Sequence, residues 1–309
     1  MNFPAKLLST VFAVACCFSI SFSVMAASSY QFSLGGSASQ FDILEGESYS
    51  LGVAAYIKPV ELDGSLPYDS AAFYTRTSGL FLGAVKTRFT DLNIVRSGAG
   101  VMKKQESSFK YVGARLAQAD FPLWLGLNYR DFDSTTMYFT NGNMINTGDT
   151  DSKRFTLGAF LTDHVSMHAF YEDANQNAYG SGVDALFDLD AFGFIGAGFE
   201  YKKVKAERIA LQVVNGSVRN LDVNKYNNEV WAASLSYYPS AKSELNWEYA
   251  FLEDGARDVH DKFYSVSASY YFFEKLRIGL TYTDYNYDNT PSFLWPDYKA
   301  YSVSANYRF

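Results

Sequence analysis

Residues 301–309 read YSVSANYRF, a stretch in which large apolar and small polar side chains alternate up to the last position. One side of an extended chain would carry Tyr301, Val303, Ala305, Tyr307 and Phe309. This period-two alternation predicts a β-strand with one apolar and one polar face. Residues 264–272 (YSVSASYYF) and 276–282 (LRIGLTY) alternate in the same way, so the pattern is a property of the chain and not of its end alone.

Composition excludes several classes of protein. The 309 residues are 48% hydrophobic and 17% aromatic, with a mean hydropathy slightly below zero, which argues against a bundle of membrane helices. Twenty-four Tyr and 26 Phe against 19% charged residues are too many aromatics for a disordered chain. A net charge of −7 argues against a nucleic-acid partner, because phosphate recognition needs a basic face.

The first 26 residues differ from the rest and predict a secretory signal peptide. Lys6 precedes an apolar run over 7–22, and small or apolar residues precede the expected cleavage after residue 26. A retained anchor helix and a lipidated Cys16 are the alternatives. Because Cys16 and Cys17 both lie in this segment, the remaining chain, residues 27–309, cannot be a disulfide-stapled fold.

The alternating segments predict an all-β fold, a transmembrane antiparallel up-and-down β-barrel of about 14 strands, with 12 to 16 as the range. We expect strands near 29–38, 48–58, 79–89, 108–117, 122–132, 153–161, 165–173, 179–187, 193–204, 230–239, 243–253, 262–272, 276–286 and 298–309. Asn215-Gly216 predicts a hairpin that extends two strands above the membrane. Residues 61–78 are long for a turn, and we expect a short helix or an inlet there.

Aromatic residues and connections distinguish a membrane barrel from a soluble sandwich, which also alternates. Tyr and Phe gather at strand ends, as two rings at the membrane interfaces would require. The lower ring would contain Tyr237, Tyr270, Phe272, Tyr307 and Phe309, and the upper ring Tyr129, Phe199, Tyr201, Tyr249, Phe251 and Tyr282. Short turns such as 118–120 and 240–242 alternate with longer polar segments at 91–107, 133–152, 206–229, 254–261 and 287–297.

The predicted inward positions are mostly small or hydrophilic, which predicts a water-filled lumen. They are Ser50, Gly52, Ala54, Gly126, Asn128, Thr156, Gly158, Gly196, Gly198, Ser234, Ser236, Ser265, Ser267, Ser269, Ser302 and Ser304. Trp124 and Phe160 share that face, but two rings cannot make an apolar core. Passive diffusion of small hydrophilic solutes is therefore the leading functional hypothesis.

Charged residues on the inward face would set ion selectivity. We expect Arg130 and Arg154 near the top, with Arg115 lower, to oppose three carboxylates across the lumen, those of Glu172, Glu200 and Glu248. The alternative is that all six are solvated lumen residues paired with their neighbours. Residues 133–152 either fold inward and narrow the channel or cover its mouth.

An enzyme is not expected, and no catalytic residue, cofactor or metal ligand is assigned. His164 and His168 on one strand would lie about 13 Å apart at roughly 3.3 Å per residue, too far to share a metal ion. His260 beside Asp258 at the rim would be a water-activating pair only if the two groups hydrogen bond; a solvated loop histidine is the simpler explanation.

Short motifs give the chain a resemblance to a known family. The ending Tyr307-Arg308-Phe309 looks like the signal read by the outer-membrane barrel-assembly machinery, with Tyr307 and Phe309 as its aromatic positions. The segments YIKPV (56–60), SAAFYTRTS (70–78), SYYP (236–239) and SYYF (269–272) resemble a family of general porins of gamma-proteobacteria.

This resemblance implies the outer membrane of a Gram-negative bacterium, passive transport, and three partners: the lipid bilayer, the barrel-assembly machinery and small hydrophilic solutes. General porins are often homotrimers, whereas some fourteen-stranded channels are monomers, and the sequence leaves both open. A non-conducting surface adhesin or scaffold that acts through its extracellular loops is the alternative function; aromatic or charged plugs crossing the lumen would favour it.

Overall fold

The computed structural model describes residues 29–42, 46–96, 100–139, 144–146, 150–174, 177–214, 217–254, 259–272, 274–287 and 298–309. The signal peptide predicted for residues 1–26 lies outside these ranges. The strands are β1 (Ser29–Phe41), β2 (Gly46–Glu61), β3 (Gly79–Arg96), β4 (Gly100–Gln118), β5 (Phe121–Phe139), β6 (Met144–Asn146), β7 (Thr150–Phe160), β8 (Val165–Asp173), β9 (Ala178–Asp188), β10 (Phe194–Val214), β11 (Ser217–Ser240), β12 (Ser243–Asp254), β13 (Val259–Phe272), β14 (Leu276–Tyr287) and β15 (Tyr298–Arg308). A short helix, α2 (Ala71–Tyr74), and a 3₁₀ turn, η1 (Asp190–Phe192), complete the elements.

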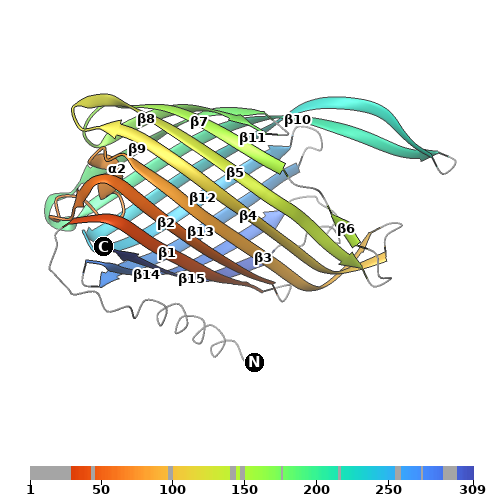
Figure 1. Ribbon diagram of the computed structural model, residues 1–309, viewed down its shortest axis with the longest axis horizontal. Helices are drawn as coiled ribbons and strands as arrows, with labels where there is room; N and C mark the ends of the chain where they lie inside the picture. Colours follow the sequence, from red (N-terminus) through yellow and green to blue (C-terminus); the bar gives the residue numbers. More distant parts are fainter. Residues whose placement is uncertain are drawn as a thin grey trace.

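The strands form one closed antiparallel barrel (Figure 1). Consecutive strands pair around the ring, and β1 pairs with β15 from Ser33↔Arg308 to Phe41↔Ala300 to complete it. The sheet has 15 strands, but β6 pairs with β5 alone, so fourteen strands make up the ring. The predicted fold and strand number are therefore confirmed.

One end of the barrel carries short turns, except for the connection between β2 and β3, and at the other end the β3–β4 and β10–β11 hairpins extend furthest. At the end we call the turn end, residues 119–120 join β4 to β5 and residues 241–242 join β11 to β12. The start of β1 and the chain's end also lie there, where the amides of Gln31 and Phe32 donate to the Phe309 carbonyl at 3.1 and 2.9 Å. We call the opposite end, beyond which β10 and β11 project in Figure 1, the loop end.

Several segments expected to be loops are strand instead. β3 reaches Arg96 and β4 begins at Gly100, so most of 91–107 is paired. β10 and β11 stay paired as far as Val214↔Ser217, which confirms the predicted hairpin extension. The expected loop boundaries were wrong because they were drawn where the apolar alternation stops. Backbone hydrogen bonds between strands do not require an apolar face, so the pairing continues further. None of the helices within the described ranges is long and apolar enough to span a membrane.

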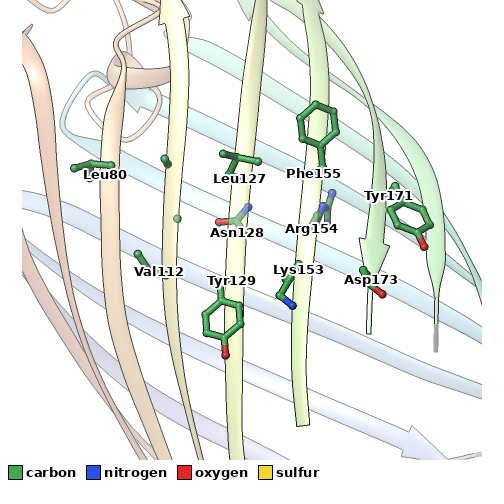
Figure 2. Close-up of a pocket in the computed structure, with 12 residues that line it drawn as sticks. Leu80, Val112, Leu127, Asn128, Tyr129, Lys153, Arg154, Phe155, Tyr171 and Asp173 are labelled. Carbon is green, nitrogen blue, oxygen red and sulfur yellow. The ribbon is translucent and has the colours of Figure 1, made fainter. Parts of the chain in front are cut away.

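The two faces of the sheet have opposite chemistry, as the alternation predicts. On the outer face, Leu82, Leu235 and Leu280 are each half or more exposed to the surroundings. Figure 2 shows this face over β3 to β8, where Leu127, Tyr129 and Phe155 border an apolar groove. An exposed belt of leucine and aromatic side chains is what a hydrocarbon environment requires of a barrel.

Aromatic pairs lie on the outer face at both ends. At the turn end Phe32 stacks on Phe309 with ring centroids 6.4 Å apart. At the loop end Tyr201 contacts Trp231, with centroids 4.4 Å apart. Phe309 belongs to the predicted lower ring and Tyr201 to the predicted upper ring.

Close contacts between glycine and rings fix parts of the inner wall, and Gly158 of β7 is the clearest case. A Cβ at this position would overlap the indole of Trp124, which donates from Nε1 to Ser166 Oγ at 3.1 Å. We expect Gly158→Ala to lower the stability of the barrel by roughly 1–3 kcal/mol through overpacking. Thermal unfolding in detergent, followed by circular dichroism, measures this.

Gly196→Ala is the matched control, because its Cβ would meet neighbouring atoms at 3.4 Å or more, an ordinary van der Waals contact. Equal unfolding temperatures for the two variants would contradict the packing described here.

Candidate functional site

The connection between β2 and β3 folds into the barrel at the turn end. We call residues 62–78 the inlet segment; it contains α2. Tyr68, Ala71 and Ala72 are buried in one cluster with Val60 and Tyr271 of the barrel wall. The predicted short helix or inlet is thus confirmed, and its side chains fill part of the lumen at this end.

Arg115 holds the inlet segment to β4. Its guanidinium donates from Nη2 to the carbonyls of Ala72 and Thr77, at 2.6 and 2.8 Å, and from Nε to Thr77 at 3.3 Å. These carbonyls belong to the last part of the inlet segment, which the wall strands do not pair. Arg115 was predicted to line the pore; it lies inward, and its donors are used to position this backbone.

A partly buried charge network attaches the inlet segment to β13, β14 and β15, which lie on the other side of β2 and β3 from β4. Asp69 accepts from the Tyr271 hydroxyl at 2.6 Å and pairs with Arg277 at 3.2 Å. Arg277 also pairs with Glu244 at 2.7 Å. Arg308 donates to the Tyr68 carbonyl at 3.0 Å, and its guanidinium lies between two tyrosine rings. One carboxylate of the inlet segment is thus held by β13, β14 and β15 together.

Aromatic packing completes the contact with the wall. The Phe73 ring lies 5.9 Å from Trp124 and 5.3 Å from Phe160, measured between ring centroids. We expected these two wall aromatics to be isolated in a wet lumen, which is wrong at the turn end: the inlet segment supplies the third ring. Sequence alternation places residues of the wall only, so it could not show this partner.

The inlet segment leaves open the arc of wall opposite its root, formed by β9 to β12. A cavity of about 270 Å³ lies between Phe73 and Tyr74 on one side and Gly196, Gly198 and Ser234 on the other. A second cavity of about 310 Å³ shares Asp184, Gly198 and Ser234 with the first. We call these two adjoining cavities the passage.

The passage is lined mainly by small wall residues, and the inlet side is neutral. Burial raises the pKa of the Tyr74 hydroxyl well above its ordinary value, so this group stays protonated near neutral pH. The second cavity adds Glu200 and Glu248 on the wall, with His168 beside them.

The predicted charges lie on the inner face, but they do not oppose one another across the lumen. Arg154 is the direct cross-strand neighbour of Glu172 on β8 and pairs with Glu200 of β10 at 2.9 Å. Its guanidinium also lies 3.6 Å from the centre of the Phe170 ring. The expected transverse field is therefore wrong for these groups; the alternative, pairing between neighbours, is what the structure shows.

The remaining predicted residues occupy separate positions. Glu172 is buried and accepts from Lys202 at 2.8 Å. Arg130 lies midway along β5, beside Ser152 of β7 in the register. Glu248 is exposed to the lumen and accepts from Asn246 at 3.0 Å.

From the sequence we did not assign Asp184 to the lumen, and we did not predict the ion pairs that hold the inlet segment. Asp184 and His168 were not assigned to the pore, yet His168 lies between Asp184 and Glu200, with nitrogen to oxygen distances of 3.7 and 3.5 Å. The alternation of inward and outward residues could have placed both inside, because His168 is paired with Gly182 and Asp184 with the inward Gly198 in the register. The partners Asp69 and Arg277 could not be joined by parity, since Asp69 is not in a strand.

Some of the other residues singled out in the sequence lie outside the part of the chain that the structure describes. The side chains of 133–152 are described only at its end, from Asp151, and Asp258 lies outside the described residues. His260 is in β13, opposite Glu253 in the register. No group of three or more His, Cys, Asp or Glu in the described ranges could hold a metal ion.

Comparison with known proteins shows the fold but not a family. No family model matches the chain, and no curated protein matches it in sequence. The crystal structure of the Acinetobacter baumannii outer membrane protein Omp33 is similar over 92% of this chain and 100% of that one, at 14% identity and a TM-score of 0.59. The P. putida toluene transporter TodX is similar over 91% and 90%, at 12% identity and a TM-score of 0.53. The chain therefore has the fold of outer-membrane barrels.

The anchoring of the inlet segment can be tested by thiol labelling. In a chain without Cys16 and Cys17, we expect Ala72→Cys to react slowly with a maleimide because residue 72 is buried. Arg115→Ala should speed the reaction at least tenfold. Hydrogen bonds from a charged donor contribute roughly 1.5–3 kcal/mol each, and about 1.4 kcal/mol changes an open population tenfold.

Ser65→Cys serves as the control, since residue 65 is exposed at the turn end and should react rapidly in both backgrounds. Rapid labelling of residue 72 with Arg115 intact would show that the inlet segment is not held as described.

Proposed function

We propose that the protein is an outer-membrane channel for passive diffusion of small hydrophilic solutes, and that the inlet segment narrows it to the passage along β9 to β12. The observation that carries this proposal is the pair of adjoining cavities beside the inlet segment, where glycine, alanine and serine form much of the wall. A wall of small residues leaves room for water inside a closed barrel.

The orientation follows from the asymmetry of the connections. Barrels of this class have short periplasmic turns and longer extracellular loops, so the turn end would face the periplasm. The inlet segment would then constrict the periplasmic mouth. Export would use residues 1–26 as a signal peptide, and Tyr307 and Phe309 would be read by the barrel-assembly machinery at the end of β15.

The finer identity remains a prediction from the sequence. Membership of the general porins of gamma-proteobacteria rests on the short motifs, and a homotrimer rests on that resemblance. A non-enzymatic role and the outer membrane of a Gram-negative bacterium agree with the barrels that share the fold.

A sealed barrel that acts as an adhesin or scaffold is the second candidate, and one observation favours it. The inlet segment is an aromatic and charged plug within the lumen, held by Arg115, Asp69 and Phe73. The β10–β11 hairpin projects beyond the barrel in Figure 1 and would be the element presented to a partner.

Single-channel recording in planar bilayers separates the two functions. The channel proposal predicts stepwise conductance of the unmodified protein. It also predicts larger steps for Phe73→Ala and Tyr74→Ala, because both side chains line the narrow cavity and neither carries an ion pair that holds the inlet segment.

The matched control is Phe192→Ala, an aromatic truncation at the same end that is 73% exposed in η1 and outside the passage. Steps that do not change with Phe73 or Tyr74 would mean that the constriction lies elsewhere. A membrane that stays silent with every variant would favour the sealed barrel.

A further inference from the structure

Four cations on the inner face of the barrel are engaged with groups of the protein. Arg115 donates to inlet carbonyls, Arg154 pairs with Glu200, and Lys202 pairs with Glu172. Arg277 is held between Asp69 and Glu244. Neighbouring groups therefore largely neutralise these positive charges, which add little to the electric field that a solute experiences.

Two carboxylates of the passage are engaged differently. Within the described residues, neither Asp184 nor Glu248 has an ion pair with lysine or arginine. The Asp184 carboxylate lies 3.7 Å from the His168 ring nitrogen, and its side chain is 44% exposed. Glu248 accepts a hydrogen bond from the neutral Asn246 side chain.

The positions of these carboxylates tie them to the solute path. Asp184 lines both cavities, and Glu248 lines the second cavity together with it. The inlet segment crowds the parts of the wall where Arg115 and Arg277 lie, so a solute is confined to the arc that carries Asp184 and Glu248. The path also passes the aromatic side chains of Phe73, Tyr74 and Tyr238, and aromatic rings attract cations rather than anions.

We propose that Asp184 and Glu248 make this channel selective for small cations, including compact organic ammonium compounds, over anions. The proposal rests on the channel function proposed above. It concerns the field along the passage and requires no fixed binding site: each of these carboxylates lowers the energy of a passing cation and raises that of an anion.

Reversal potentials under a salt gradient test the proposal. We expect a potassium to chloride permeability ratio above one for the unmodified protein and for Tyr74→Ala. Asp184→Asn and Glu248→Gln should each lower the ratio by about two- to fivefold, from the interaction of unit charges at several ångströms in a mostly aqueous lumen. The double variant should approach or pass equal permeability.

Glu229→Gln is the matched control, because this carboxylate pairs with Lys203 at 3.1 Å on the outward-facing positions of β10 and β11. Its ratio should equal that of the unmodified protein.

The outcomes separate the two proposals. Conductance with a ratio at or below one, or a ratio that neither substitution changes, overturns the selectivity proposal and leaves the channel intact. A complete absence of conductance overturns both. A fall with Glu229→Gln as large as that with Asp184→Asn also overturns it, because the effect would then reflect overall charge.

Discussion

Pairing of β1 with β15 is the constraint on which the rest of this structure depends. A sheet in hydrocarbon must satisfy every backbone N–H and C=O internally, and only closure leaves no edge. The ladder from Ser33↔Arg308 to Phe41↔Ala300 provides that closure. It also fixes which side chains meet the membrane and which meet the lumen. Once the ring is closed, the interior is a limited space, and any connection that turns inward must be accommodated by the wall.

Polar side chains on the inner face of the wall bind the inlet segment and hold it in the lumen. Arg277 and Arg308 lie on inward positions of β14 and β15, where an unpaired buried guanidinium would be costly. Asp69 supplies the opposing charge from the inlet segment. On the other side Arg115 satisfies carbonyls that no strand pairs. The same contacts that hold the segment against one arc leave the β9 to β12 arc open, so anchoring and the position of the passage have one cause.

Local periodicity predicted the barrel, because in a strand the alternation of residues directly reports the alternation of media. Serines such as Ser265 and Ser302 and leucines such as Leu280 fell on the faces that parity assigns. The alternation shows which face of the wall a residue is on, but it does not show how close two inward residues are to each other around the barrel. Arg154 and Glu200 were therefore placed on facing walls although three strand pairings bring them together on one side. The contact of Phe73 with Trp124 was also beyond prediction, because it joins an irregular segment to a strand.

The most direct test of the account is solvent access at two adjacent residues of β11. Ser234 lines the passage and Leu235 is half exposed on the outer face. In lipid vesicles, a cysteine at position 234 should react with a membrane-impermeant thiol reagent, and a cysteine at position 235 should not, because hydrocarbon surrounds it. Equal reactivity at both positions, or the reverse order, would contradict a wet lumen enclosed by a lipid-facing wall.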